Sequence, residues 1–375
     1  MSAGEKYLIA GGRIDIAELP KVSLHDHLDG GLRPQTIIEL ADDADIDLPA
    51  DDAEELRNWF VGQADAGSLP AYLETFDVTV GVMQSTDALT RVAREFVTDL
   101  AEDGVIYGEV RWAPEQHLGR GLSLDETVDA VQEGIEQGIE EARRVTGHDI
   151  RIGQILTAMR HADRGFEIAE LALRRRGRGV VAFDIAGGEA GNPPSRMIDA
   201  FDLLAEEWMP VTVHAGEADG LESIRGALLD GRALRLGHGV RIAEDIDLEN
   251  EDDETTFVSL GTLAQWVKDR EIALELAPSS NLQTGAIAAW GDELADHPFD
   301  LLYQLGFRVT VNPDNRLMSD TSITRELALL VDAFGYDISD LEVFQLNAAA
   351  ASFLPVEDRE DLADRISDGF DAAGR

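Results

Sequence analysis

The chain has 375 residues, of which 44% are hydrophobic, carries a formal net charge of −43 and contains no cysteine. Without cysteine it forms no disulfide, no thiol nucleophile and no Cys-based zinc site, and its acidic surface disfavours nucleic acid and anionic membranes as partners. No apolar run reaches the roughly 18–20 residues that span a bilayer, and residues 1–12 lack the basic region of a signal peptide, so we expect a cytoplasmic protein.

Acidic residues outnumber basic ones by 74 to 31, and lysine is rare among the basic ones. One explanation is adaptation to high salt, where screening shortens the reach of self-repulsion to about 3 Å at 1 M; the other is a compositional bias toward Arg and Asp. Adaptation to salt predicts that the free energy of unfolding rises with NaCl concentration in a denaturant titration. A maximum already reached in dilute buffer would contradict it.

Short apolar segments alternate with longer amphipathic ones along the whole chain. Eight of the short segments are predicted strands, and most are apolar on both faces, as in a parallel sheet covered by helices. They are Lys21–His27, Val105–Arg111, Ile150–Ala158, Val180–Asp184, Val211–His214, Leu234–His238, Ile272–Leu276 and Phe307–Asn312. This alternation predicts an α/β fold, a (β/α)8 TIM barrel that forms a single domain over residues 1–375. An open doubly wound sheet is the alternative, but no glycine-rich phosphate-binding motif supports it.

The amphipathic segments predict the helices between these strands. The clearest are Thr86–Glu102, Ser123–Val145 and Arg196–Trp208, and a further helix is expected from Val356 onward. The patterns Ser123–Glu126 and Ser339–Glu342 each predict a capping box at the start of a helix.

Two segments depart from a minimal barrel. A long helical insertion follows the first strand, with helical patterns at Pro34–Ala41, Asp52–Phe60 and Pro70–Met83. An insertion at the carboxyl end of a barrel strand lies over the barrel mouth, so we expect it to act as a lid. The acidic segment Asp245–Glu254 is predicted to be a solvated loop.

Polar residues gather at the predicted carboxyl ends of four strands, the end at which barrels build their active sites. His25 and His27 alternate along the first strand and therefore face the same side. His214 ends the fifth strand, His238 ends the sixth and Asp314 follows the eighth. Three imidazoles and a carboxylate hold a divalent metal and leave a position for water, and ligation rich in nitrogen favours zinc. Any one of these residues alone would suit a structural role, but four strand ends together favour a metal centre.

Six motifs in this order resemble those of the adenosine deaminase family, and the similarity runs from Leu19 to Phe353. They are Pro20–Gly30 (PKVSLHDHLDG), Val110–Pro114 (VRWAP), Asp184–Gly187 (DIAG), His214–Glu217 (HAGE), Gly237–Gly239 (GHG) and Ser279–Gly285 (SSNLQTG). The resemblance implies a zinc-dependent (β/α)8 hydrolase of purine salvage. Such an enzyme converts a small-molecule 6-aminopurine nucleoside to its 6-oxo form and ammonia.

The resemblance also implies roles for individual residues in the metal centre. His25, His27, His214 and Asp314 would bind one Zn²⁺ per chain, which lowers the pKa of a bound water from 15.7 toward roughly 7. His238 and Asp314 would orient this water and take up its proton. Glu217 would protonate the purine nitrogen N1 while C6 is attacked, which requires a carboxyl group with a raised pKa.

Three further residues would contact the nucleoside. Gly187 would donate its backbone N–H to the purine nitrogen N3, and Asp29 would accept a hydrogen bond from the ribose 5′-hydroxyl. Many family members have a second Asp where this chain has Asn315, whose amide donates to N7 whatever the pH. A carboxylate at position 29 repels a 5′-phosphate, so a nucleoside is expected to fit better than AMP.

Several functions remain open beside the deamination of adenosine and 2′-deoxyadenosine to inosine and 2′-deoxyinosine. The same reaction is compatible with adenine, or with a 5′-modified adenosine such as aminodeoxyfutalosine. A metal-binding protein without turnover would be expected to lack Glu217 or His238, and both are present. A zinc amidohydrolase acting on amides usually has a bridging lysine at a strand end, which this chain lacks. The oligomeric state is not predicted, and His117, His148, His161 and His297 receive no role.

Overall fold

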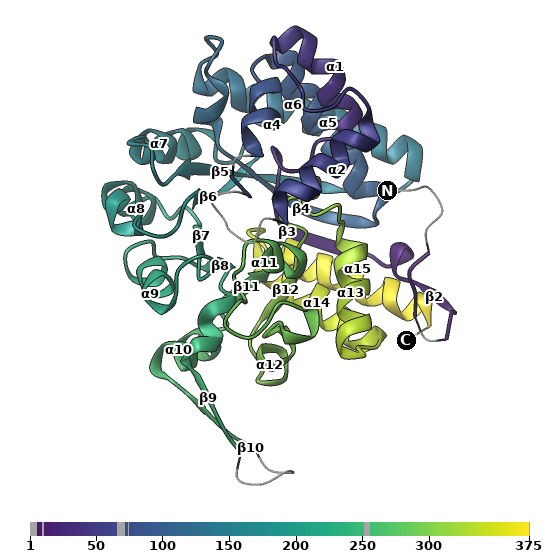
Figure 1. The fold of residues 1–375 in the computed structure, drawn as a ribbon, viewed down its shortest axis with the longest axis vertical. Helices are drawn as coiled ribbons and strands as arrows, with labels where there is room; N and C mark the ends of the chain where they lie inside the picture. The colour runs from purple at the N-terminus through teal and green to yellow at the C-terminus, as the bar shows by residue number, and fades with distance from the viewer. Residues whose placement is uncertain (1–5, 10, 66–71, 74, 251–255, 375) are drawn as a thin grey trace.

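Eight parallel strands surround the centre of the fold in the computed structural model, which describes residues 6–9, 11–65, 72–73, 75–250 and 256–374 (Figure 1). The strands are β3 (Lys21–His27), β4 (Val105–Trp112), β5 (Arg151–Met159), β6 (Val180–Ala186), β7 (Thr212–Ala215), β8 (Arg235–His238), β11 (Ala273–Leu276) and β12 (Val309–Val311). They form two four-stranded sheets in the orders β3-β4-β5-β6 and β7-β8-β11-β12. Parallel bridges from Phe183 to Val211 and from Asp26 to Asp314 join the sheets at both seams. The two sheets therefore close into the predicted (β/α)8 barrel.

All eight predicted strands are confirmed; the first has the predicted bounds, and no end of the others shifts by more than two residues. The largest difference is β12, which is shorter than the predicted Phe307–Asn312. Asn312 lies just beyond it and uses its side-chain oxygen to accept from the backbone N–H groups of Leu24 and His25, at 3.2 and 3.1 Å. A side chain thus replaces part of the backbone pairing where β12 meets β3.

Helices cover the outside of the barrel, as the colour gradient of Figure 1 allows the reader to follow. They are α5 (Thr86–Glu102), α6 (Leu124–Thr146), α7 (Gly165–Arg175), α8 (Ile198–Glu206), α9 (Leu221–Leu229), α10 (Thr262–Asp269), α11 (Pro278–Gln283), α12 (Phe299–Gln304), α13 (Ile323–Phe334), α14 (Ile338–Ala351) and α15 (Val356–Ala373). The remaining short elements are the strands β1 (Leu8–Ile9) and β2 (Ile14–Asp15) and 3₁₀ turns at Ile16–Glu18, Pro114–His117, Pro194–Met197, Val240–Asp245 and Leu294–Asp296. In the described part of the chain, no helix is both long and apolar enough to cross a membrane.

One of the two predicted capping boxes is confirmed. At the start of α6, Ser123 accepts from the backbone N–H of Glu126, and Glu126 accepts from the backbone N–H of Ser123. The prediction for Ser339–Glu342 is wrong, because α14 begins two residues earlier with Asp337 and Asp340 as the capping pair. Asp337 is an equally good N-cap, and its carboxylate accepts two N–H groups of the first turn.

The predicted insertion after β3 is helical and consists of α1 (Pro34–Ala44), α2 (Ala53–Ala64) and α4 (Phe76–Val82). These three helices lie close together in Figure 1, on the side of the molecule where α5 and α6 lie. Part of the pattern predicted at Pro70–Met83 falls on residues 70, 71 and 74, outside the described residues. The described part supplies Tyr72 and Phe76 to the cavity discussed below.

The acidic segment predicted to be a loop at Asp245–Glu254 is partly a strand. Ile246–Asn250 forms β9, which pairs antiparallel with β10 (Thr256–Leu260), and the hairpin projects away from the barrel in Figure 1. Residues 251–254 lie outside the described residues. The prediction was wrong because Ile246 and Leu248 alternate with Asp247 and Glu249. Such an alternation of apolar and polar residues is typical of a strand, but the many acidic residues were interpreted as a loop.

Candidate active site

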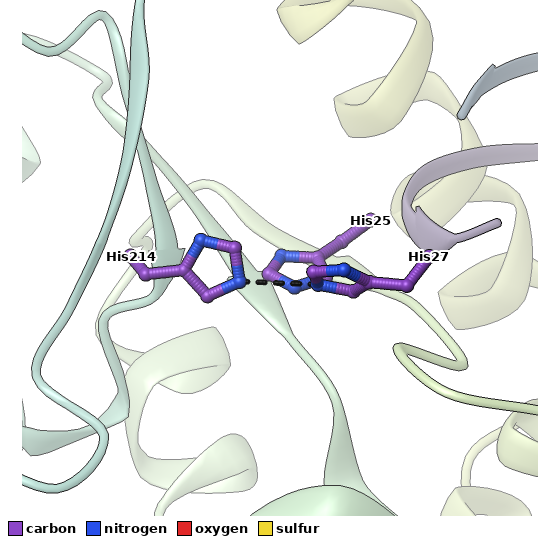
Figure 2. Close-up of side chains that lie close together, drawn as sticks. All are labelled: His25, His27 and His214. Carbon is purple, nitrogen blue, oxygen red and sulfur yellow. Dashed lines mark hydrogen bonds between the residues drawn. The ribbon is translucent and has the colours of Figure 1, made fainter. Parts of the chain in front are cut away.

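The four predicted metal ligands converge at the carboxyl ends of three barrel segments. His25 and His27 end β3, His214 lies on β7, and Asp314 follows β12. One oxygen of Asp314 (Oδ1) lies 3.3 Å from Nε2 of both His25 and His27, so the two β3 histidines face the same side, as expected. Nε2 of His27 lies 3.2 Å from Nε2 of His214, and this is the contact dashed in Figure 2.

The donor atoms of this cluster fit a divalent metal. Nε2 of His25 and Oδ1 of Asp314 are buried and have no hydrogen-bond partner among the described residues, although they face each other. Unpaired buried polar atoms are costly unless an ion or water satisfies them. Burial lowers the pKa of both His27 and His214, which keeps their rings neutral and able to coordinate a cation. Three nitrogens and one oxygen form a ligand set that zinc accepts.

Acidic residues behind the cluster hold two of the histidines from their other ring nitrogen. Nδ1 of His25 lies 2.9 Å from Glu275, and Nδ1 of His214 lies 2.9 Å from Asp184. Arg111 connects the two acids, at 3.0 Å from Asp184 and 2.6 Å from Glu275. Carboxylates in this position fix the orientation of ligand histidines and raise their basicity.

Sequence reasoning gave these three supporting residues no role. All three were included in predicted strands, and Arg111 and Asp184 were also part of motifs. The signal was nevertheless in the sequence, because each is a charged residue inside a nearly apolar strand, where it must be buried and therefore paired.

His238 and Glu217 lie beside the histidine cluster. Nε2 of His238 is 3.6 Å from a carboxylate oxygen of Glu217. The amide nitrogen of Asn281 lies 3.0 Å from Nδ1 of His238, and its oxygen lies 3.2 Å from Nε2 of His297. Asn281 in this orientation donates to Nδ1, so the proton of a neutral His238 resides on Nε2. His297, which was given no role, thus fixes the amide that selects this tautomer.

The electrostatics of the two acids of the site differ in direction. Burial, with the nearby charges of Asp314 and Glu189, raises the pKa of Glu217 well above its ordinary value. Burial also opposes ionisation of Asp314, but its interactions with His25, His238 and His27 prevail and hold its pKa well below the usual range. The pKa values of these two buried acids are therefore shifted in opposite directions, a division typical of acid–base catalysis.

Two residues at the site adopt a left-handed backbone conformation that is uncommon outside glycine. His238 has φ of 61° and Asp314 has φ of 59°. Such conformations persist where the surrounding structure imposes them, and they cluster at functional sites. Each directs a side chain from the end of its strand toward the barrel axis, where His25 lies 4.7 Å from His238 between ring centroids.

A cavity of about 380 Å³ opens above the cluster. Its floor contains His27, His214, Glu217, His238 and Asp314, and its outer wall contains Tyr72, Leu73, Phe76 and Val80 from the insertion. The volume lies in the range of roughly 300–1,000 Å³ that is typical of small-molecule sites. The insertion therefore covers the barrel mouth, as predicted.

The three residues expected to contact substrate also line this cavity. Gly187 has φ of 92°, and a Cβ atom there would lie 3.0 Å from Cε of Met159, so a side chain is disfavoured. Burial raises the pKa of Asp29 to about 7. Asn315 packs against Gly30, where an added Cβ would lie 2.0 Å from the amide oxygen of Asn315.

The histidines that received no role differ in their positions. His161 lines the cavity next to Gly187, and nothing in its sequence context indicated this. His117 is buried and contacts the backbone oxygen of Met83 at 3.0 Å. His148 is exposed.

Comparisons with known proteins agree with this geometry. A family model described as Adenosine deaminase matches residues 20–369. Adenosine deaminase 1 of Streptomyces coelicolor is 57% identical over 345 residues, which cover 92% of this chain and 85% of that protein. Adenosine deaminase of Mycobacterium avium is 53% identical over 352 residues, or 94% of this chain and 95% of that protein.

Solved structures share the fold. The adenine deaminase of Arthrobacter aurescens matches with a TM-score of 0.79 at 24% identity, covering 93% of this chain and 98% of that one. Arabidopsis ADAL complexed with IMP matches with a TM-score of 0.78 at 25% identity, covering 95% of this chain and 98% of that one.

Proposed function

The chain belongs to the adenosine deaminase family, and from this premise we propose that it catalyses the zinc-dependent hydrolytic deamination of adenosine and 2′-deoxyadenosine. The products are inosine or 2′-deoxyinosine and ammonia. The observation that carries the proposal is the convergence of His25, His27, His214 and Asp314 beside a cavity that also contains Glu217, whose pKa is raised by burial. A purine ring bearing an exocyclic amine needs this combination of an activated water and a nearby acid.

His25, His27, His214 and Asp314 would hold the zinc ion, which supplies a water whose pKa is lowered to roughly 7. His238 carries its proton on Nε2 and donates a hydrogen bond from it to the attacking water, so it orients this water but, in contrast to the expectation from the sequence, leaves uptake of the proton to Asp314. Ser280 donates to Oδ2 of Asp314 at 2.6 Å, which leaves Oδ1 to face the cluster and to accept a proton from this water. The two side chains together direct a lone pair of the water at C6.

Glu217 delivers the proton that the ring needs. When water attacks C6, negative charge moves onto N1, and a carboxyl group that is still protonated neutralises it there. Gly187 offers its backbone N–H to N3 on the opposite side of the six-membered ring, where the absence of a side chain permits close approach. The proton taken up by Asp314 then passes to the 6-amino group, which leaves as ammonia, while the C6 hydroxyl gives its proton to Glu217 and the 6-oxo product keeps the proton on N1.

Asp29 and the lining of the cavity favour a nucleoside over a nucleotide. Asp29 lies in the cavity wall and is suited to accept a hydrogen bond from the 5′-hydroxyl. Its pKa of about 7 means that it bears a partial negative charge at neutral pH, which disfavours a 5′-phosphate. Two relatives whose sequences are more than 50% identical to this chain are adenosine deaminases. We therefore favour adenosine as the substrate over adenine or a 5′-modified adenosine.

Zinc content and turnover should be measured on the same preparation. We expect about one zinc per chain by elemental analysis, and a fall in ultraviolet absorbance when adenosine is added, as the 6-amino purine becomes the 6-oxo purine. AMP, adenine and a 5′-modified adenosine serve as competing substrates. A higher kcat/KM for any of these three would overturn the substrate assignment, and the absence of turnover on all of them in the zinc-loaded protein would overturn the activity.

Replacing Asn315 by Asp tests the proposed contact with N7. An aspartate donates a hydrogen bond only while it is protonated, whereas the amide donates at every pH. We therefore expect kcat/KM for adenosine to approach that of the wild type at low pH and to fall about tenfold below it at alkaline pH, as for the loss of one hydrogen bond to a buried group. Unchanged kinetics with an unchanged pH profile would remove any role for Asn315 at N7.

A further inference from the structure

The buried carboxylate of Glu189 accepts hydrogen bonds from four consecutive backbone N–H groups. Oε1 accepts from Gly216 at 2.6 Å, and Oε2 accepts from Glu217, Ala218 and Asp219 at 3.1, 2.7 and 3.0 Å respectively. Glu189 is only 3% exposed. A carboxylate that accepts several backbone N–H groups forms charge-assisted hydrogen bonds, which are stronger than neutral ones.

These hydrogen bonds join two loops that follow neighbouring strands. Glu189 belongs to the loop after β6, two residues beyond Gly187, and the four N–H groups belong to the loop after β7 that carries Glu217. Gly216 has φ of 75°, which turns the chain so that successive N–H groups point to one side. Without an acceptor at position 189, four N–H groups would lose their partner in a largely buried region, a costly arrangement.

The two loops act on the same ring of the proposed substrate. Gly187 would donate to N3, while Glu217 would protonate N1, and the distance between these two atoms is fixed by the rigid purine. A loop shift of about 1 Å at a reacting group can lower a rate by roughly 10²-fold. The separation of the two loops therefore matters for proton transfer, and Glu189 is the side chain that spans it.

We propose that Glu189 is a positioning residue that holds the loop of Glu217 at a fixed separation from the loop of Gly187. This inference rests on the proposed function, because it assumes that Glu217 protonates the substrate. A purely structural role would stabilise the fold without a specific effect on turnover. The experiment must therefore separate loss of stability from loss of proton transfer.

Glu189→Gln is the principal variant. It replaces one acceptor oxygen by an amide NH₂ group that faces backbone N–H groups and cannot accept from them. We expect kcat for adenosine to fall by roughly 10- to 100-fold, with a smaller change in KM and an unchanged zinc content. Hydrogen exchange of the peptide that contains residues 216–219 should become faster. Glu189→Asp keeps two acceptor oxygens on a shorter side chain, so it should retain more of kcat than Glu189→Gln.

Asp103→Asn is a matched control at the other end of the barrel. Asp103 is also a buried carboxylate, and it accepts from the backbone N–H of Thr324 at 3.2 Å and from the hydroxyl of Ser322 at 3.0 Å. Asp103 precedes β4 and lies far along the chain from either loop. Even if Asp103→Asn loses as much thermal stability as Glu189→Gln, its kcat should therefore stay near that of the wild type. Equal falls in kcat for Asp103→Asn and Glu189→Gln at equal loss of stability would overturn the positioning role.

A double-mutant cycle decides whether Glu189 acts through Glu217. In the Glu217→Gln background, Glu189→Gln should lower the residual kcat by less than about threefold, because the effects of substituting residues that act as a unit are not additive. Fully additive losses would overturn the inference, as would wild-type kcat and wild-type exchange at residues 216–219 in Glu189→Gln. High activity of Glu217→Gln alone would instead contradict the proposed function itself, so the two failures are distinguishable.

Discussion

Replacing Glu217 by glutamine is expected to lower kcat for adenosine by roughly 10²–10⁴-fold, the usual contribution of a general acid, while the protein still binds its metal. Glutamine has nearly the same shape and remains a hydrogen-bond donor, but it has no proton to transfer to N1. The ligands His25, His27, His214 and Asp314 are untouched by this change. Zinc content and KM should therefore stay close to those of the wild type, and steady-state kinetics with elemental analysis provide the measurement.

The pH dependence of the wild type follows from the same group. Burial is the main cause of the raised pKa of Glu217. Because the acid must be protonated to act, its contribution to kcat is present below this raised pKa and is lost as the pH rises through it. The alkaline limb of the wild-type profile should therefore disappear in Glu217→Gln, whose residual activity no longer depends on this ionisation.

Glu222→Gln is the matched control for this prediction. Glu222 lies on α9, five residues farther along the chain, and its side chain is 85% exposed. The same chemical change there should leave kcat, KM and the pH profile unaltered. Retention of more than about one tenth of wild-type kcat by Glu217→Gln would exclude general acid catalysis by this residue.

The barrel could be predicted from the sequence because its strands are short, apolar and evenly distributed. Strands such as Val180–Ala186 are buried on both faces, so their residues are nearly all apolar and the segment stands out from the helices around it. The β9–β10 hairpin was not predicted because the apolar residues of β9 alternate with acidic ones. The N-cap of α14 was predicted wrongly because two good capping residues, Asp337 and Ser339, lie two positions apart. In both cases the local sequence is compatible with two structures, and tertiary contacts determine which one forms.

The residues of the candidate site also differ in how far the sequence alone could identify them. Residues at strand ends, such as His25 and His238, could be identified because barrel topology gathers these ends at one rim. The partners of Glu275 and Asn281 could not be predicted, since their contacts with these histidines join positions far apart in the chain, although burial of a charged residue such as Glu275 could be. Glu189 lay in a loop after a motif, where a solvated acid is the ordinary expectation.

Removal of His214 is expected to abolish metal binding. His214→Ala deletes one of three nitrogen ligands and also the partner of Asp184, so we expect the affinity for zinc to fall by more than the roughly 10- to 100-fold that follows loss of a supporting residue around a metal. The fold should persist, because Asp184 keeps its ion pair with Arg111 at 3.0 Å. The checks are zinc content after dialysis against a weak chelator, circular dichroism and turnover of adenosine, which should fall below detection.

His148→Ala makes the same substitution at an exposed position outside the barrel rim, and it should keep both the metal and the activity of the wild type. The comparison is informative because His214 contributes to a cluster in which each donor is close to the others: its Nε2 lies 3.2 Å from that of His27, and its ring centroid lies 4.6 Å from that of His25. If His214→Ala kept a full complement of zinc, the ion would have to be bound without a ligand from β7, contrary to the proposed ligand set. Full retention of metal would therefore refute the ligand assignment and, with it, the delivery of water to C6 that the proposed reaction requires.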